Sequence, residues 1–392
     1  MSEFVERRWE GDPGAYGPRR ARAPFTYRAF VPDEIATLDP AIPFETHDLI
    51  MAAEAAVSAL NADSGAIGLE AVGPLLLRSE AIASSRIEGY ELSQRNLARA
   101  LIDPRAARGT ARTVAANVVA MEEAIALGDS ERPLTMDDLA AIHRTLMADE
   151  PRARPGEIRR EQNWIGGRFD SPIDARYIPP PETEVERLME DLIAFLARDD
   201  LPAPAQAAIA HAQFETIHPF LDGNGRVGRC LIHVVLRRRR VAPRFVPPVS
   251  IVLAARPNSY VDGLVGFREG RVAAWCASFA GALERAARLS VELAKDVASL
   301  QEQWHERAGR PRRDSAAARI IPVLPAQPIT SAAIVRGAIN ARHQRALEGL
   351  KVLEAAGVVR RISEKTWDQQ YAADDLFSLL ERYEEAISSG IG

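Results

Sequence analysis

A potential base, a carboxylate, an asparagine, three glycines and two arginines fall within the twelve residues from His218 to Arg229, HPFLDGNGRVGR. Two apolar runs with helical spacing flank this stretch, Ala205 to Thr216 and Val227 to Leu236. Gly223 and Gly225 have no Cβ, so they allow a positive φ and leave the backbone amides accessible to a ligand. Amides that converge at the start of a helix bind anions, because the helix dipole favours negative charge there. The loop is therefore expected to form an anion site.

The charged side chains around the loop indicate which anion it binds and what chemistry follows. Arg226 and Arg229 are three residues apart and share one face of the helix, and two guanidiniums beside an amide nest favour a nucleoside triphosphate. Asp222 is a hard oxygen ligand that can hold Mg²⁺ against the phosphates. The ordinary pKa of a histidine side chain is about 6.5, so His218 can take a proton from a hydroxyl at neutral pH. The simpler alternative is a helix–loop–helix turn with a core histidine and surface arginines.

The string HPFLDGNGRVGR resembles the signature HxFxDGNGRxxR of the Fic family at every defined position. This resemblance implies a mainly α-helical fold and an enzyme that transfers AMP from ATP to a Ser, Thr or Tyr hydroxyl of a protein, itself included. It makes His218 the base and Asp222 the Mg²⁺ ligand, and it places Arg229 on the γ-phosphate. The nucleotide-binding residues that it implies are Gly223, Asn224, Gly225, Arg226, Gly228 and Arg229.

One further nucleotide contact is expected from the same resemblance. Tyr260 stands where the family often has a pair of tyrosines near the nucleotide base. Its neighbour here is Val261, so one of the two aromatic rings is missing and adenine specificity has less support.

A second motif lies in the string SEAIASSRIEGYELS. Ser84 and Glu88 are four residues apart, so they lie on one face of a helix that Gly89 would end. A helix ending in Glu-Gly is common by itself. Beside the signature, however, the string resembles the family's inhibitory motif [S/T]xxxE[G/N] in the form that precedes the catalytic core. The resemblance implies that Glu88 pairs with Arg229 and excludes the γ-phosphate. A charge-assisted Arg–carboxylate bond is strong enough to compete with a phosphate for the same guanidinium.

The helical pattern stops between Pro151 and Pro181. Two short strand-like pieces, Asn163 to Ile165 and Ala175 to Ile178, are joined by a loop rich in Gly, Asp and Pro. They resemble the family's flap, a β-hairpin that pairs through its main chain with the target segment. The alternative is a surface hairpin whose aromatic residues pack. The target-binding residues that the resemblance implies are Asn163, Trp164, Ile165, Gly166, Gly167 and Tyr177.

We divide the chain into five parts. They are an N-terminal arm (1–45), a helical region with the inhibitory helix (46–110), a Fic catalytic core (111–305), a linker (306–314) and a C-terminal domain (315–392). The arm is expected to be extended, with Phe25, Tyr27, Phe30 and Val31 along a helical body. Helices are expected over 47–61, over 74–87, over 94–149 with breaks near 103–104 and 129–133, and over 280–305.

The C-terminal part contains three short helical units, over 315–324, 331–339 and 342–356, followed by a cap at Gly357 and a strand over 358–362. This order resembles the winged-helix domain of many long Fic proteins. Its third helix has a basic side, yet residues 315–392 hold nine basic and nine acidic residues. DNA binding therefore stays open, beside a protein-docking or homodimer role. The basic side consists of Arg342, His343, Arg345 and Lys351.

Composition narrows the class of protein further. The chain has 392 residues, a formal charge of −5 and two cysteines, Cys230 and Cys276, which suits a reducing cytosol. Its start shows no secretory signal and no apolar run approaches a membrane span, so we expect a cytoplasmic protein. The four arginines from 237 to 240 are more typical of cations at a helix C-terminus than of a nucleic-acid patch.

The sequence supports three hypotheses about function. The first is an adenylyltransferase restrained by Glu88, acting on a target protein that the sequence does not identify. The second is AMP removal in the same pocket, with the glutamate positioning water. The third is a DNA-binding regulator whose core senses nucleotide.

Overall fold

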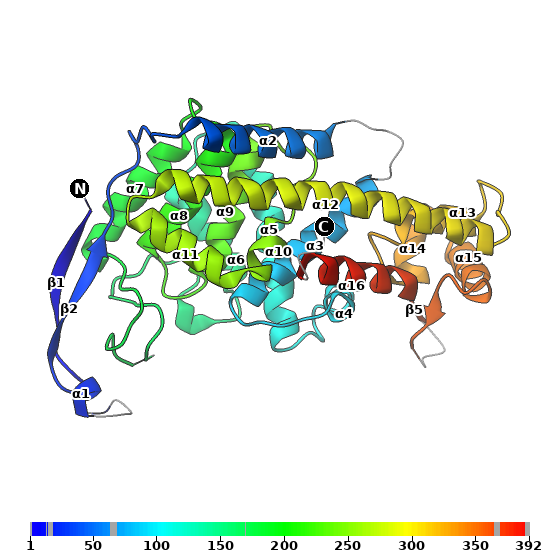
Figure 1. Cartoon of the computed structure of the whole chain (residues 1–392). Coiled ribbons are helices and arrows are strands. Elements are labelled where there is room, and N and C mark those ends of the chain that lie inside the picture. Colours follow the sequence, from blue (N-terminus) through cyan, green and yellow to red (C-terminus); the bar gives the residue numbers. More distant parts are fainter. Residues whose placement is uncertain are drawn as a thin grey trace. The chain divides into compact units, whose positions relative to one another are not determined.

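The computed structural model describes residues 2–12, 14, 19–62, 69–168, 170–363 and 369–388. In these residues the chain is mainly α-helical, as expected, with small antiparallel sheets (Figure 1). It forms two compact units. The first comprises residues 1–51, 119–240 and 258–280, and the second comprises residues 52–118, 241–257 and 281–392. The five-part division made from the sequence stays a prediction.

The N-terminal arm is a β-ribbon rather than an unpaired extended segment. Strand β1 (Glu3–Trp9) pairs antiparallel with β2 (Phe25–Val31), and the short helix α1 (Arg19–Arg22) lies between them. Strand β2 is also bonded to the segment around Ile178, because Phe30 N–H donates to Ile178 O at 3.0 Å. Strand β1 was not predicted from the sequence, because four of the residues of EFVERRW are charged and charged side chains are depleted in strands.

Two helices frame the glycine-rich loop. Helix α8 (Ala203–Ile217) is buried along its whole length, and α9 (Asn224–Arg238) is buried from Asn224 to Leu236 except at Gly225. A helix without a polar face belongs inside a core, which explains the Ala-rich sequence of α8. Helix α7 (Val185–Leu196) packs against α8, and α6 (Met136–Leu146) packs against both α7 and α9.

Helix α6 begins just after the break expected near 129–133. Thr135 is the N-cap, and its main-chain N–H and hydroxyl both donate to Asp138 Oδ2 at 2.9 Å in a capping box. The Arg132 guanidinium beside Asp138 holds the pKa of that carboxyl at about 2.

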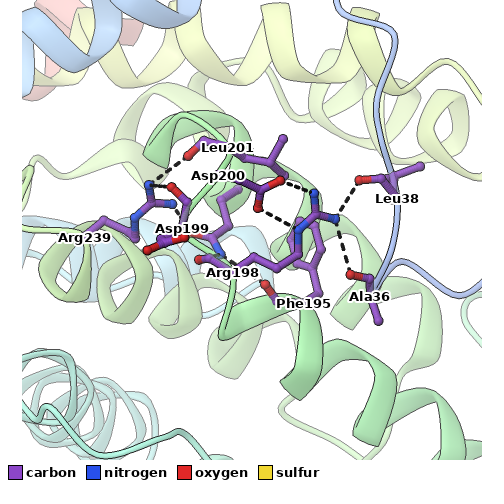
Figure 2. A network of polar contacts seen from close by, with 9 residues as sticks. Ala36, Leu38, Phe195, Arg198, Asp199, Asp200, Leu201 and Arg239 are labelled. Atoms are coloured by element: carbon purple, nitrogen blue, oxygen red, sulfur yellow. Dashed lines mark hydrogen bonds and ion pairs between the residues drawn. The ribbon is translucent and has the colours of Figure 1, made fainter.

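The four arginines that end α9 are structural, as the sequence favoured. Arg237 binds the Asp129 carboxylate at 2.6 and 2.8 Å, and Arg238 donates to Ser130 O and Arg132 O. Arg239 donates to the carbonyls of Asp199 and Leu201, as Figure 2 shows, and to Gln206 Oε1 at 2.6 Å. Arg240 lies 3.8 Å from Glu131. These bonds tie the end of α9 to two neighbouring loops and give each guanidinium a partner within the protein.

The second unit contains the predicted helix before the core and the C-terminal elements. Helix α3 (Leu69–Ile87) packs against α10 (Val249–Ala255), and the buried Glu80 carboxylate accepts from Ser250 N at 2.8 Å and Ser250 Oγ at 2.5 Å. The remaining helices with part or all of their length here are α2 (Phe44–Asn61), α4 (Gln94–Ile102), α5 (Thr110–Gly128), α11 (Pro257–Arg268) and α12 (Val272–Arg307).

The C-terminal elements follow the predicted order with extra strands. Helices α13 (Ala316–Ile320), α14 (Ala332–Ala338) and α15 (His343–Ala355) match the three predicted helical units. The predicted strand is shorter, β4 (Arg360–Arg361), and it joins β3 (Ile329–Ser331) and β5 (Gln370–Ala372) in a sheet of order β3-β5-β4. Helix α16 (Asp374–Ser388) was not predicted. The winged-helix identity of these elements stays a prediction.

Two negative findings apply to the part of the chain that the structure describes. No helix there is long and apolar enough to cross a membrane. Cys230 and Cys276 are buried and form no disulfide, and burial raises the pKa of the Cys276 thiol to about 12.

Candidate active site

His218 stands at the end of α8 in a strained conformation. It is the C-cap residue, with φ 52° and ψ 60°, and its N–H donates to Phe214 O at 2.9 Å. A left-handed backbone costs a non-glycine residue about 1–2 kcal/mol, and such strain is concentrated at functional sites. The half-buried ring has Nδ1 3.4 Å from Glu215 O. A proton on Nδ1 fits that contact and leaves Nε2 as the basic nitrogen.

Asn224 closes the loop that follows. Its Oδ1 accepts from Phe220 N at 2.9 Å and its Nδ2 donates to Phe220 O at 2.8 Å, so both ends of the amide hold one residue of the loop. The side chain is 2% exposed. These bonds give Asn224 a positioning role, whereas the sequence suggested a phosphate ligand.

His143 supports the loop from α6. Its ring stacks on Phe220 with centroids 3.8 Å apart and planes 3° from parallel. Gly156 N donates to its Nδ1 at 2.9 Å, so its Nε2 carries the proton and donates to Asp222 O at 3.0 Å. Burial lowers the pKa of His143 to about 4, and the ring is therefore neutral near pH 7. The hydrogen bond from His143 to the loop leaves no pattern in the sequence around it.

Arg159 is a second support that the sequence did not reveal. It is 2% exposed, and its guanidinium donates to four carbonyl groups. Two of these belong to the end of α8, His218 O at 2.8 Å and Ile217 O at 3.3 Å. The others are Glu161 O at 3.1 Å and Pro180 O at 2.6 Å. Burial lowers the pKa of Arg159 to about 10, so it keeps its charge at neutral pH.

Asp222 and Gly223 form the tip of the loop. Asp222 is exposed, and its Oδ1 accepts from Gly223 N at 2.6 Å. Gly223 has φ +77°, and a Cβ there would lie 2.9 Å from Met147 Sδ, so the turn requires glycine. Gly225 differs from the prediction, because it lies inside α9 and shows no positive φ.

The metal prediction rests on one carboxylate. Among the described residues no group of three His, Cys, Asp or Glu side chains is placed to hold a metal. An exposed carboxylate beside an anion site still suits Mg²⁺, since that ion takes most of its ligands from phosphates and water. Asp222 therefore fits the role only when nucleotide is bound.

The first two turns of α9 carry the two arginines. Arg226 and Arg229 are 2% and 1% exposed, and Arg226 Nη2 lies 3.4 Å from Met147 Sδ. Gly228 lies on the face toward α8, where a Cβ would come within 2.7 Å of Glu215 Oε1. The Gly228 position thus lets α8 and α9 approach closely, in addition to any contact with nucleotide.

Tyr260 lies in an aromatic cluster rather than at an open base pocket. It is 6% exposed, and its hydroxyl lies 2.8 Å from His211 Nε2. Trp275 packs beside both rings and donates its Nε1 hydrogen to Ala208 O at 2.7 Å. Burial, with the nearby Arg229 charge, lowers the pKa of His211 to about 3. The cluster stabilises the back of α8, and a contact of Tyr260 with the base stays a prediction.

In the described residues of the predicted flap, the strand pairing is limited to one bridge between Ile165 and Tyr177. Gly166 and Gly167 turn the chain with φ +73° and +70°. Two of the predicted target residues have intramolecular roles, because Trp164 packs on Trp9 and Tyr177 donates to Thr216 O at 2.7 Å.

Asn163 ties this segment to the loop, since its Nδ2 donates to Phe220 O at 2.8 Å. The flap and the loop therefore share a main-chain acceptor. Target binding by the flap residues stays a prediction.

The helix with the second motif ends as the sequence indicated. Gly89 has φ +84°, its N–H donates to Arg86 O at 2.9 Å, and Tyr90 N donates to Ser85 O at 3.0 Å. This pair of bonds is a Schellman motif that ends α3, and it puts Glu88 at the C-terminus of the helix. Ser84 is fully buried in the second unit.

Comparison with known proteins bears on this loop directly. Residues 133–236 match the family model described as Fic/DOC. These residues are a Fic domain. The matched segment runs from the approach to α6 to the end of the apolar part of α9, so the Fic domain contains His143, Arg159, the flap and the whole signature loop.

Curated relatives cover part of the chain. The chain is 33% identical over 155 residues to protein adenylyltransferase Fic of Culex quinquefasciatus, a match to 39% of this chain and 28% of that protein. It is 32% identical over 117 residues to the protein of the same name from Drosophila melanogaster, or 29% of this chain and 22% of that one. The chain thus matches about a quarter of the relatives' length.

Solved structures show the same fold. A Fic family protein from Desulfovibrio desulfuricans aligns with a TM-score of 0.53 at 23% identity, over 86% of this chain and 98% of that one. A Fic domain containing signaling protein from Bacteroides thetaiotaomicron aligns with a TM-score of 0.53 at 19% identity, over 63% and 97%. At these identities the likeness concerns the fold alone.

Proposed function

We propose that this protein transfers AMP from ATP to a hydroxyl group of a protein. The observation that carries the proposal is the loop between α8 and α9, which His143, Arg159 and Asn224 hold by hydrogen bonds. The loop presents a histidine at one end and the start of a helix with two buried arginines at the other. The relatives named protein adenylyltransferase Fic, 32–33% identical over the matched residues, support the same chemistry.

Each residue of the loop then has a task in the reaction. The amides at the start of α9 and the guanidiniums of Arg226 and Arg229 would bind the triphosphate. His218 would accept the proton of the target hydroxyl, whose oxygen forms a bond to the α-phosphorus. The bond from that phosphorus to the bridging oxygen breaks, and pyrophosphate leaves. Mg²⁺ bound by Asp222 and the phosphates would neutralise charge on the leaving group.

AMP removal from a modified protein would use the same residues with water in place of the hydroxyl. The names of the curated relatives favour transfer. Both directions can be followed with one labelled substrate, because transfer attaches the label of ATP to protein and removal releases it.

His218 provides the decisive test of the chemistry. His218→Ala should lower AMP transfer from labelled ATP to lysate proteins by roughly 10²–10⁴-fold, the usual effect of losing a general base. ATP binding, measured by calorimetry, should survive because the phosphate ligands lie on α9. The matched control is His47→Ala, which changes an exposed histidine of α2. Transfer by His218→Ala at the wild-type rate would remove His218 from the mechanism.

We also propose that Glu88 restrains the enzyme by competing for Arg229. A carboxylate at a helix C-terminus lies beside the negative end of the dipole, which costs about 0.3–1 kcal/mol. We therefore expect Glu88 to have a functional role that offsets this cost. An Arg–carboxylate bond contributes about 1.5–3 kcal/mol, roughly ten- to a hundredfold in an equilibrium, which is enough to exclude a γ-phosphate and still be reversible.

Glu88→Gly tests this restraint separately from the chemistry. Self-modification and lysate labelling should rise by at least about tenfold, from the same bond energy. The control is Glu91→Gly, an exposed glutamate just beyond the end of α3, which should leave labelling unchanged. If Glu88→Gly labels no better than wild type while His218→Ala is inactive, transfer stands and the restraint by Glu88 is wrong.

A further inference from the structure

The C-terminal part of the chain contains a helix-turn-helix. Helices α14 and α15 are joined by the four residues Ile339–Arg342, with Asn340 in the left-handed region at φ +46° (Figure 1). One face of α15 is buried, through Ala346, Gly349, Leu350 and Leu353. Gly349 allows this contact, because a Cβ there would lie 2.8 Å from Ala316 of α13. The inner face of α15 is therefore fixed by packing.

The opposite face of α15 is exposed along the helix. Its side chains combine donors, acceptors and one apolar group, and Val352 is 46% exposed. At 13 residues, α15 is about 20 Å long, which suits insertion into a groove of DNA. The exposed residues of this face are Gln344, Arg345, Glu348, Lys351 and Val352.

The charges of the C-terminal part are separated along the chain, although their total is balanced. Residues 315–352 contain five Arg and Lys and one Glu, whereas residues 353–392 contain four Arg and Lys and eight Asp and Glu. Much of the acidic group lies on α16, where several carboxylates are already bonded. Asp374 binds Arg95 and Arg360, Asp375 binds Arg307, and Glu384 binds Arg86. The helix-turn-helix side is therefore strongly basic.

Several cations on this side lack acidic partners. Within the described ranges of the chain, no carboxylate forms an ion pair with Arg336, Arg342, Arg345 or Lys351. A cavity of about 380 Å³ lies at the N-terminus of α15, lined by Arg319, Arg342, Arg345 and Asn340, with Asp314 as its one carboxylate. Arg342 and Arg345 at the N-terminus of α15, with Arg319 of α13 beside them, favour a phosphate by charge and by the helix dipole.

We propose that α15 enters the major groove of double-stranded DNA, while Arg342 and Arg345 hold a backbone phosphate at the cavity. A basic helix-turn-helix whose second helix has a packed inner face and a mixed polar outer face is the arrangement that reads base edges. Duplex RNA does not fit, because its major groove is too narrow for a helix. Gln344 can pair with adenine and Val352 can contact a thymine methyl group. This proposal is independent of AMP transfer.

The test uses the full chain and a fluorescent duplex of random sequence, with binding followed by anisotropy over a range of salt concentrations. Arg342→Glu/Arg345→Glu should bind roughly ten- to a hundredfold more weakly at moderate salt, and the magnitude of the slope of log K against log salt should fall by about 1, for the one phosphate lost. The control with equal charge change is Arg288→Glu/Arg382→Glu, on exposed positions of α12 and α16 in the same unit. It should bind DNA almost as wild type does, and both variants should keep full AMP transfer.

Three results would overturn the proposal. They are no binding of any duplex by the wild type at low salt, equal losses in both double variants, and tighter binding of duplex RNA or an acidic peptide than of DNA. Lys351→Glu gives a second measurement that does not involve the helix start. It should also weaken binding, so a folding defect at Arg342 would not hide the outcome. Gln344→Ala should reduce the preference for whichever sequence is selected from the random pool.

Discussion

The buried, charged guanidinium of Arg159 holds the active-site loop in place. Its guanidinium joins the end of α8 to the segment before α7 through four carbonyl groups, of which His218 O is one. The bonds to His218 O and Ile217 O orient the main chain that carries the proposed base, and the bonds to Glu161 O and Pro180 O fix the guanidinium itself. Displacing a catalytic group by about 1 Å can cost a hundredfold in rate, even when the displaced residue itself is unchanged.

Arg159→Gln should therefore lower the rate of AMP transfer by roughly ten- to a hundredfold while ATP still binds. Arg159→Lys keeps the charge but loses the planar fork, so it should recover only part of the rate. The neighbouring exposed Arg160→Gln is the control. Single-turnover rates, normalised to folded protein, distinguish positioning from stability. A normal rate per folded molecule in Arg159→Gln would show that the residue serves only the fold.

At the scale of elements, glycines decide how closely helices approach. Gly228 on α9 faces Glu215 and His211 of α8, whereas Gly281 on α12 is exposed, and a Cβ added there would have no atom within 4 Å. Both residues lie inside helices. The same substitution should thus have opposite effects at the two positions.

Gly228→Ala should destabilise the protein by about 1–3 kcal/mol, because its Cβ would overpack the α8–α9 contact. Gly281→Ala should stabilise it by up to about 1 kcal/mol, the difference in helix propensity. Chemical denaturation of the two variants beside wild type measures both changes. A neutral Gly228→Ala would mean that α9 can move away from α8 at little cost.

The elements also show how far the sequence leads. Helices α8 and α9 on either side of the signature cover the two predicted apolar runs, and Gly89 ends α3 as predicted. The β-ribbon was missed because its strands carry charged residues and pair over a long separation. Arg159 and Arg160 are identical neighbours in the sequence, and only folding decides which is buried. The supports of the loop bind main-chain carbonyls, which leave no residue pattern.

At the scale of the whole molecule, two buried histidines should make stability depend on pH. Folding lowers the pKa of His143 to about 4 and that of His211 to about 3, from about 6.5 in the unfolded chain. Below about pH 6.5 the unfolded state binds more protons than the folded state. The stabilisation that comes from keeping both rings neutral is therefore fully present above about pH 6.5. Below that pH, the free energy of unfolding falls by about 1.4 kcal/mol per pH unit for each histidine.

Urea unfolding between about pH 7 and pH 5 should show this decline, and His211→Gln should remove part of it. The exposed His47→Gln should leave the slope unchanged. Asp138, with a pKa of about 2, contributes only below about pH 4 and lies outside this window. A midpoint that stays constant from pH 7 to pH 5 would contradict the assignment of both rings as neutral.

The bonds that hold Asn224 also bear on how the protein ages. Asn-Gly is the dipeptide in which a side-chain amide most readily cyclises onto the next backbone nitrogen and loses ammonia. Here Asn224 precedes Gly225 at the first turn of α9, and Phe220 holds its amide from both sides. Deamidation therefore requires the loop to open, so mass spectrometry of protein stored at alkaline pH reports how often it opens. Each such event would replace the amide that donates to Phe220 O with a carboxylate, so we expect the stored protein to bind ATP more weakly while it is still folded.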